Sequence, residues 1–339
     1  MDHHGRAVRT GTAAILCALI LRLGAAGVPE KVLAWLKEPN TAAFLIYLET
    51  GRDVRFSASG EVFWEYAPES AQPILPVLAP DPEEPALPVF TPDDTALTDM
   101  FYGCDLRPDL ENLLTRPLSW DLADGVPRVL ILSTHTTESY TQGPDSYVES
   151  SQYRTLDENH NMLSIGQLVA TILSENGIAV IQDKTLHDYP SYNGSYNHAR
   201  KSIVNFLEEY PTIQLILDLH RDAADMEVGQ LRTVAQVDGQ TSAQLMLVMG
   251  TDESGLTHEN WKENLALALK LQAQLERQAP GITRPTYLRA QRFNQDLSPG
   301  ALLVEVGAAG NTHQEALTAV EVLAQAIADL KKGAETPAT

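Results

Sequence analysis

The chain has 339 residues and a formal net charge of -21, and 44% of its residues are hydrophobic. This length and apolar content are enough for a sizeable buried core in one domain or two. The negative charge excludes binding of nucleic acid through a general electrostatic field. Its only cysteines, Cys17 and Cys104, exclude a disulfide framework and a cysteine zinc site, so a bound transition metal would need histidine and carboxylate ligands.

The N-terminal segment has the pattern of an export signal or a membrane anchor. Arg6 and Arg9 precede residues 12–28, which are mostly Ala, Leu, Ile and Gly. Arg22 interrupts this run, so an ordinary buried helix is the alternative. Because the run has no clear Ala-x-Ala cleavage site, we expect residues 1–28 to be an uncleaved anchor in the cell membrane, with the catalytic domain outside the cytoplasm.

Two segments without candidate catalytic residues follow. Residues 29–66 contain one short helical pattern and two short strand patterns. Residues 67–126 are predicted to be a proline-rich acidic linker and a lead-in, because eight of the twenty prolines fall within residues 67–92. Proline lacks the backbone N–H and disrupts helices and central strands, so this stretch is expected to be semi-extended.

From residue 127 onward, strand patterns alternate with helical patterns. Apolar strand-like runs occupy residues 128–132, 178–181, 213–219 and 301–306. Helical periodicity occupies residues 161–176, 197–210, 260–278 and 314–332. A hairpin is predicted to join residues 233–237 to residues 244–249 through Asp238-Gly239. The alternation predicts an α/β domain over residues 127–332, a three-layer sandwich with a mostly parallel sheet, followed by a tail at residues 333–339.

Polar side chains follow or interrupt three of these apolar strands, at the edge where open α/β sheets build active sites. His135 and Glu138 follow the first strand, His220 ends the third and Glu305 lies inside the last. Zinc accepts imidazole nitrogen and carboxylate oxygen, and a catalytic zinc site usually has three protein ligands and a water. We therefore predict that His135, Glu138 and His220 bind zinc, and that Glu305 is the general base.

Other residues around these clusters have predicted supporting roles. Asp218 would orient His220, Arg221 would bind a substrate carboxylate, and Asp222 is also predicted to bind substrate. The alternatives are a structural Arg–Asp ion pair at the strand end and a satisfied core glutamate at position 305. Further predicted substrate-binding residues are Asn294, Gln295 and Tyr192.

Four longer motifs extend the same clusters. They are Thr134–Tyr140, Asp183–Asp188 with Tyr192–Tyr196, Leu217–Asp222, and Phe293–Gly307 with Asn311 and Thr312. With these motifs, residues 127–332 resemble the stage II sporulation protein P family of endospore-forming bacteria. The resemblance implies an N-acetylmuramoyl-L-alanine amidase that also cuts peptide cross-links, with a fold similar to the zinc amidases of the cell wall.

The resemblance also implies partners and a ligand pattern. The expected partners are peptidoglycan, a lytic transglycosylase of the stage II sporulation protein D type and other membrane proteins of engulfment. The related amidases hold zinc with His, Glu and His, and here the middle ligand is Glu138, Glu149 or Glu158. An endopeptidase or carboxypeptidase that acts only on cell-wall peptide, and an inactive scaffold at the septum, remain as alternatives.

Overall fold

The computed structural model describes residues 54–56, 62–64, 72–76, 87–141, 153–224 and 230–335. The chain divides into two compact units, Met1–Ala67 and Pro68–Thr339. The described part of the first unit is an antiparallel pair of short strands, β1 (Val54–Phe56) and β2 (Val62–Trp64). The predicted membrane anchor lies outside the described residues, and within those residues no helix is long and apolar enough to span a membrane.

The second unit contains a seven-stranded sheet with the order β3-β10-β9-β11-β6-β4-β5. Neighbouring strands are parallel except β9 and β11, which are antiparallel. The predicted α/β fold with a mostly parallel sheet is therefore confirmed. The strands are β3 (Met100–Gly103), β4 (Val129–Leu132), β5 (Val180–Gln182), β6 (Leu215–Asp222), β9 (Leu245–Gly250), β10 (Thr286–Arg289) and β11 (Ala301–Ala308).

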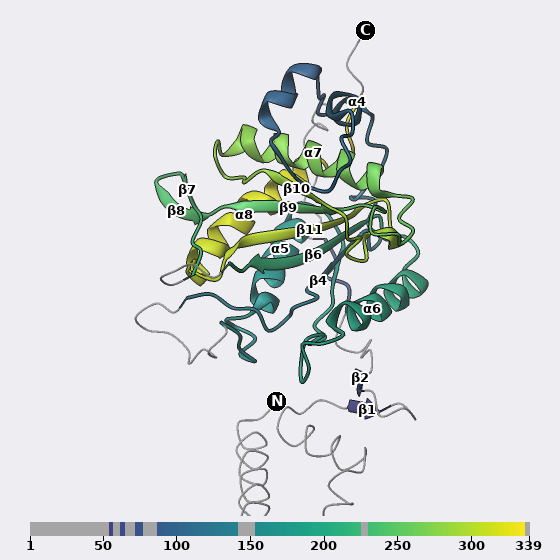
Figure 1. The fold of residues 1–339 in the computed structure, drawn as a ribbon, viewed down its shortest axis with the longest axis vertical. Helices are drawn as coiled ribbons and strands as arrows, with labels where there is room; N and C mark the ends of the chain where they lie inside the picture. The colour runs from purple at the N-terminus through teal and green to yellow at the C-terminus, as the bar shows by residue number, and fades with distance from the viewer. Residues whose placement is uncertain are drawn as a thin grey trace, which may run out of the picture. The chain divides into compact units, whose positions relative to one another are not determined.

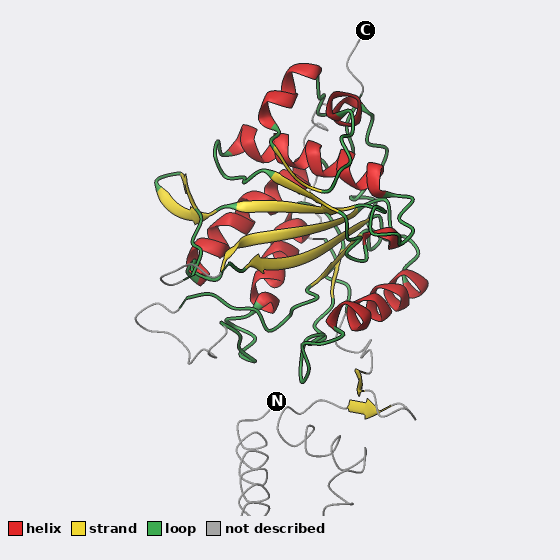
Figure 2. Ribbon diagram, in the orientation of Figure 1, coloured by secondary structure: helices red, strands yellow, loops and turns green. Residues whose placement is uncertain are grey.

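Three long helices cover one face of this sheet: α5 (Met162–Glu175), α7 (Trp261–Gln278) and α8 (His313–Asp329) (Figures 1 and 2). Each presents an apolar stripe to the strands, because residues three or four apart lie on one side of a helix. Hydrogen bonds fix two of the helix starts. The Asn161 side chain accepts from the Leu163 N–H before α5, and Thr312 and Glu315 form a capping box at α8. The short elements η2 (Pro92–Leu97) and α4 (Leu110–Thr115) pack against α7.

Strand alternation separates the two faces of the sheet. Val129 and Ile131 of β4 belong to the core cluster that contains residues of α5, α7 and α8. Leu130 and Leu132 point the other way and are equally buried. α6 (Ser195–Glu209) contributes buried apolar side chains outside that cluster, so we infer that it covers this second face over β4 to β6. Over β9 and β11, the second face carries a small separate cluster instead.

The predicted hairpin is wrong in its second strand. Asp238 and Gly239 do form the turn, with positive φ values of 49° and 79°. The turn joins β7 (Val234–Val237) to β8 (Gln240–Ala243), and residues 245–250 enter the main sheet as β9. The sequence of β8, Gln-Thr-Ser-Ala, has no apolar run and therefore does not predict a strand. Strands β3 and β10 were also not predicted, and β3 lies within the predicted lead-in segment.

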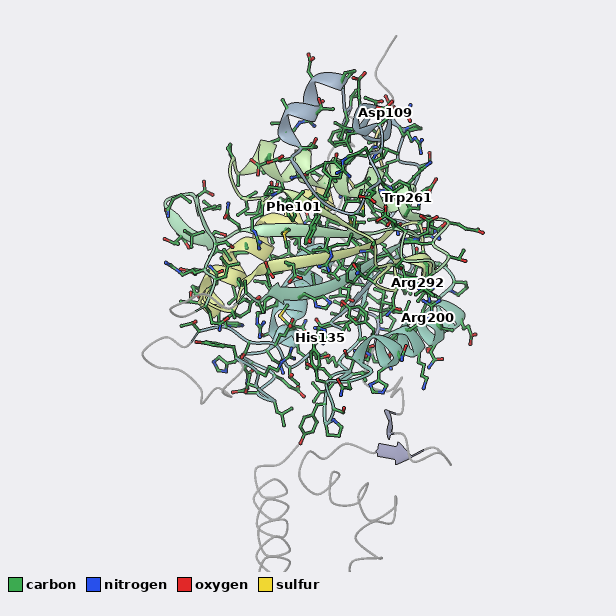
Figure 3. The ribbon with its side chains drawn as sticks, viewed as in Figure 1. Phe101, Asp109, His135, Arg200, Trp261 and Arg292 are labelled. Carbon is green, nitrogen blue, oxygen red and sulfur yellow. The ribbon has the colours of Figure 1, made fainter. Side chains whose placement is uncertain are left out.

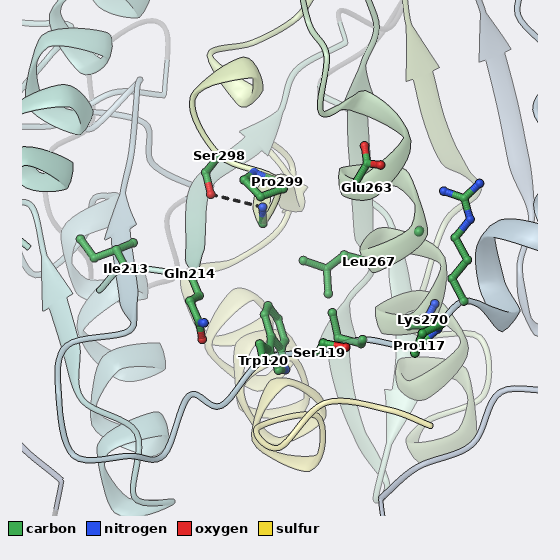
Figure 4. A pocket seen from close by; sticks show the side chains of 14 residues that line it. Pro117, Ser119, Trp120, Ile213, Gln214, Glu263, Leu267, Lys270, Ser298 and Pro299 are labelled. Atoms are coloured by element: carbon green, nitrogen blue, oxygen red, sulfur yellow. Dashed lines mark hydrogen bonds between the residues drawn. The ribbon is translucent and has the colours of Figure 1, made fainter. Parts of the chain in front are cut away.

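A cavity of about 390 Å³ lies at the opposite end of strands β6 and β11 from the predicted catalytic residues (Figure 4). Its walls include the residues just before β6 and β11, whereas His220 and Glu305 lie in the later halves of the same strands. Lys270 of α7 lines the cavity and is 1% exposed, with its ammonium donating to the Leu113 carbonyl at 3.1 Å. Burial and the nearby charge of Arg116 lower the pKa of Lys270 to about 8.

Replacing Lys270 with methionine should stabilise the fold at neutral pH. The folded-state pKa lies below the usual value of 10.5, so a charged Lys270 costs stability below about pH 8. As pH rises from 8 to 10.5 the lysine becomes neutral in the folded and then the unfolded state, and this cost disappears. We expect a gain of about 1–3 kcal/mol at pH 7 that shrinks as pH rises above about 8 and is lost above 10.5, measured by chemical denaturation. Lys262→Met, on the exposed side of α7, is the control, and equal gains for both variants would contradict the explanation.

Candidate active site

The structure brings the four predicted catalytic side chains close together, and one of them, His135, is labelled in the lower part of Figure 3. Glu305 of β11 lies opposite His220 of β6 in the parallel register. The ring centroids of His135 and His220 are 5.2 Å apart. Nδ1 of His220 lies 3.8 Å from Oε2 of Glu138. Strand pairing and the turn after β4 therefore bring together residues that are far apart in sequence.

That turn places His135 and Glu138 near each other. The Glu138 N–H donates to the His135 carbonyl at 3.0 Å, which closes a tight turn after β4. Asp218 holds the start of the turn, because it accepts from the Thr134 N–H at 2.8 Å and from the Thr134 hydroxyl at 2.7 Å. The predicted strand-end motif thus forms a turn anchored to the neighbouring strand.

Asp218 also pairs with His220. Its Oδ1 lies 3.0 Å from Nε2 of His220, although the angle is outside hydrogen-bond geometry. Burial alone would lower the pKa of His220, but the carboxylates of Asp218, Glu138 and Glu305 outweigh burial and raise this pKa to about 10. Conversely, burial would raise the pKa of Asp218, and the interaction with His220 together with the Thr134 hydrogen bonds holds it below its usual value.

His135 has the opposite electrostatic environment. Burial, followed by the nearby charges of His220 and Arg154, lowers the pKa of His135 to about 3. The ring stacks on Tyr192 at 4.6 Å between centroids, with the Tyr192 hydroxyl 3.3 Å from Nε2. Nδ1 is buried and has no hydrogen-bond partner among the described residues. A neutral imidazole with an unused nitrogen is suited to bind a metal.

Glu305 is held in a state suited to proton transfer. Its burial raises the pKa to about 8, a shift that the neighbouring His220 opposes and Glu138 reinforces. Oε2 is buried and lacks a hydrogen-bond partner in the described part of the chain. A carboxyl group whose pKa lies close to neutral pH can both accept and release a proton.

Two arginines hold Glu138. The backbone N–H of Arg221 donates to Glu138 Oε2 at 3.2 Å, and Nη2 of Arg154 lies 3.3 Å from Glu138 Oε1. Arg154 also pairs with the buried Asp188 at 2.5 Å, and Asp188 accepts from the Thr137 N–H and hydroxyl. The carboxylate of Glu138 is therefore ionically paired on one side and faces His220 on the other.

The remaining predicted substrate residues differ in their surroundings. Arg221 is buried, and its guanidinium donates to the carbonyls of Ser139 and Tyr153. Asp222 forms an ion pair with Arg284 at 2.8 Å. Of the other predicted contacts, Tyr192 alone is largely exposed, at 55% of its surface, and it lies directly against His135. The substrate-binding roles of Arg221, Asp222 and Tyr192 stay predictions.

Asn294 and Gln295 help to build the wall of the site. The Asn294 side chain donates to the Tyr196 carbonyl at 2.8 Å and thereby ties the segment after β10 to the start of α6. Gln295 is buried in η3 (Gln295–Leu297), where it accepts from the Gly250 N–H and donates to the Val248 carbonyl. The Gln295 side chain contacts protein backbone, and the Asn294 side chain also accepts from the Arg200 guanidinium at 3.4 Å. Contact of either residue with substrate stays a prediction.

Sequence reasoning missed Arg154 and did not assign roles to Asp188 and Tyr196. Tyr196 makes an edge-on contact with His135 at 5.6 Å and stacks loosely on His220 at 6.4 Å. Asp188 and Tyr196 belong to the quoted motifs, so a signal for them was present. Arg154 follows a segment without periodicity, and nothing in the sequence indicates that it would reach both Glu138 and Asp188.

The donor atoms suit zinc, but they are not arranged as a completed metal site. No three histidine, cysteine, aspartate or glutamate side chains in the described ranges are placed so that they could hold an ion. Among the buried side-chain atoms that lack hydrogen-bond partners within those ranges are three of this site, His135 Nδ1, His220 Nε2 and Glu305 Oε2. Two imidazoles and a carboxylate form a typical zinc donor set. In the predicted set the carboxylate is that of Glu138, and Glu305 is the predicted base. Among the alternatives for the middle ligand, Glu138 faces His220, Glu158 is exposed and Glu149 lies outside the described residues.

The sequence profile described as Stage II sporulation protein P matches residues 91–328, which is more than half of the chain. The chain belongs to this family. The Stage II sporulation protein P of Bacillus subtilis (strain 168) is 27% identical over 218 residues, covering 61% of this chain and 52% of that protein. The chain thus spans about half the length of this curated relative.

Two solved structures of amidases are similar in outline. An N-acetylmuramoyl-L-alanine amidase of Nostoc punctiforme, AmiC2, is 15% identical with a TM-score of 0.36, covering 59% of this chain and 94% of that chain. The CwlD amidase of Clostridioides difficile, solved with the GerS lipoprotein, is 16% identical with a TM-score of 0.37, covering 60% of this chain and 97% of that chain.

Replacing Arg154 with alanine should destabilise the protein by about 2–4 kcal/mol, because it leaves the buried carboxylate of Asp188 without its cationic partner and removes one of the two arginines that hold Glu138. Denaturant titration measures the effect. Lys332→Ala is the matched control, since Lys332 pairs with Asp121 near the surface and should cost less than about 1 kcal/mol. Similar losses for the two variants would show that the buried ion pairs do not stabilise the site.

Proposed function

We propose that this family member is a zinc-dependent peptidoglycan hydrolase that cleaves the N-acetylmuramoyl-L-alanine amide bond, and peptide cross-links as well, during engulfment in sporulation. The observation that carries the proposal is the in-register pairing of Glu305 with His220, next to His135 and Glu138. It places a buried proton acceptor beside three side chains of the kind that bind zinc.

His135, His220 and Glu138 would hold the ion, which would supply a Lewis acid that polarises the scissile carbonyl and activates a water molecule. Asp218 lies beside the ring of His220, and Arg154 and Arg221 hold Glu138. These contacts keep the candidate ligands close together, and side-chain rotations would bring them into position when an ion binds.

Glu305 then performs the proton transfers. Its carboxylate accepts a proton from the attacking water at the buried Oε2 and donates that proton to the leaving amine. The Tyr192 ring forms part of the rim next to His135 and would contact the substrate around the scissile bond.

The biological setting belongs to the same proposal. The substrate is peptidoglycan, and the partners are a lytic transglycosylase of the stage II sporulation protein D type and other membrane proteins of engulfment. A single N-terminal anchor would hold the enzyme at the cell membrane with its catalytic domain outside the cytoplasm. Family membership supports this setting, since the Bacillus subtilis relative carries the sporulation name.

Digestion of purified peptidoglycan should release fragments whose new ends identify the reaction. Mass spectrometry should find free muramic acid carboxyl ends and L-alanine amino ends if the amide bond is cut. Glu305→Gln should reduce this release by roughly a hundredfold or more, because glutamine cannot accept the proton. Products cut only between peptide residues would favour a peptide-specific endopeptidase, and an inactive wild-type chain that still binds the wall would favour a scaffold.

Elemental analysis tests the metal independently of activity. We expect about one zinc per chain in the wild type and in Glu305→Gln, because Glu305 is assigned to proton transfer and not to ligation. His220→Ala should lose the zinc, while Glu158→Ala, which changes an exposed glutamate, should keep it. Zinc retained in His220→Ala would overturn the assignment of His220 as a ligand.

A further inference from the structure

A line of aromatic side chains leads from the candidate active site across the sheet. Tyr196, which contacts His135, lies 6.0 Å from Phe293 between ring centroids. At the far end, the rings of Tyr287 and Phe101 are 4.8 Å apart. Arg289 joins the two parts, because its guanidinium lies 5.8 Å from the Phe293 ring and 4.8 Å from the Tyr287 ring.

Strand register shows that this line lies on the same face of the sheet as the catalytic residues. Phe101, Tyr287, Val248, Leu303 and Asp218 are partners across five neighbouring strands. Partners across a sheet project from the same face. From β11 to β3 the line crosses three strand spacings, or about 14 Å, so it could contact a ligand longer than the scissile group.

No long helix occupies this part of the face within the described residues. The apolar side chains of β9 and β11 here, Met246, Val248 and Leu303, are covered by Tyr287 and Phe293. Phe101 is 57% exposed, whereas its neighbour Tyr102 points to the other face and packs against the main core. Apart from its contact with Tyr287, the Phe101 ring leaves apolar surface in water at the edge of the sheet.

The chemistry of the line favours a carbohydrate over a peptide. Tyr196, Phe293, Tyr287 and Phe101 offer ring faces, on which the C–H faces of sugar rings stack. Arg289 is the one fixed charge in the line, and its N–H groups can donate to sugar hydroxyl or acetamido oxygens. A stem peptide carries several carboxylate and ammonium groups, and the line has too few charged partners to neutralise them.

We propose that four side chains of this line, Phe101, Tyr287, Arg289 and Phe293, bind the glycan strand of the substrate and extend the active site from Tyr196 toward β3. The inference rests on the proposed function, since a glycan is the part of peptidoglycan attached to the amide that Glu305 would help to cleave. It assigns the glycan to this half of the sheet and leaves the stem peptide to the side of His135 that carries Tyr192 and Arg154.

Two measurements separate this inference from the proposed function. The first is binding of the wild-type chain and its variants to purified glycan strands from which the stem peptides have been removed, so that no cleavage is involved. Phe101→Ala should bind about threefold to tenfold more weakly, and Phe101→Tyr should bind like the wild type. Leu75→Ala, which removes another exposed apolar side chain at the opposite end of the sheet, should have no effect.

The second measurement is the kinetics of cleavage on two substrates. On long glycan strands that carry stem peptides, Phe101→Ala should raise KM by a similar factor and leave kcat unchanged. On a substrate with a single muramoyl sugar, the two proteins should behave alike, because that substrate ends before the aromatic line. Circular dichroism and thermal unfolding should show that Phe101→Ala is folded.

The possible results have different meanings. Unchanged glycan binding by Phe101→Ala would overturn the inference, and so would an equal loss on the long and the short substrate. Weaker binding to isolated stem peptides, with glycan binding intact, would reassign the line to peptide and overturn it as well. Glycan binding that depends on Phe101, in a chain that cleaves neither substrate, would support the inference and contradict the proposed function.

Discussion

The candidate active site depends on the pairing of β6 with β11. This parallel register sets Glu305 opposite His220, and no other contact in the described residues brings the two side chains together so directly. A shift of one residue would turn Glu305 to the face covered by α5, α7 and α8, because strand side chains alternate. The catalytic geometry is therefore fixed by apolar packing of the two longest strands, both of which are buried along most of their length.

Buried carboxylates then fix the turn that carries His135. Asp218 holds Thr134 and Asp188 holds Thr137, so the turn is tied at both ends to neighbouring segments. His187 adds a third contact, since its Nδ1 lies 3.1 Å from the Ser133 carbonyl. Burying these charged groups is costly unless they are paired. Besides its hydrogen bonds with the turn, Asp218 lies beside His220 and Asp188 pairs with Arg154. The polar network thus restricts the catalytic side chains to a narrow range of positions.

Much of the fold could be predicted from sequence because its long elements have clear periodicity. The predicted strands and helices from residue 128 to residue 329 correspond to β4, α5, β5, α6, β6, α7, β11 and α8. The misses are physically understandable. β3 and β10 are four residues long and partly exposed, and β8 is polar, so none of the three shows a buried apolar run. The sequence predicts β9 as one half of a hairpin because Asp238-Gly239 lies shortly before it and the polar sequence of β8 does not indicate a strand between them.

The site shows a similar division. His135, His220 and Glu305 could be found because each interrupts or ends an apolar strand, which is a local signal. Arg154 and the aromatic line depend on tertiary contacts between segments far apart in the chain, so no local pattern predicts them. Asn294 and Tyr196 do belong to sequence motifs, but their contact with each other requires the segment after β10 to meet the start of α6.

The antiparallel junction between β9 and β11 has a consequence for how such a protein can change. Strands β11, β6, β4 and β5 run one way and deliver their carboxyl-terminal ends to the reaction centre, whereas β9, β10 and β3 run the other way and bring only a flank of side chains. If that flank binds glycan as proposed, substitutions there would alter binding and leave the candidate metal ligands and Glu305 in place. The reversal of strand direction therefore divides the sheet into a half that carries His220 and Glu305 and a half that carries none of the candidate catalytic residues.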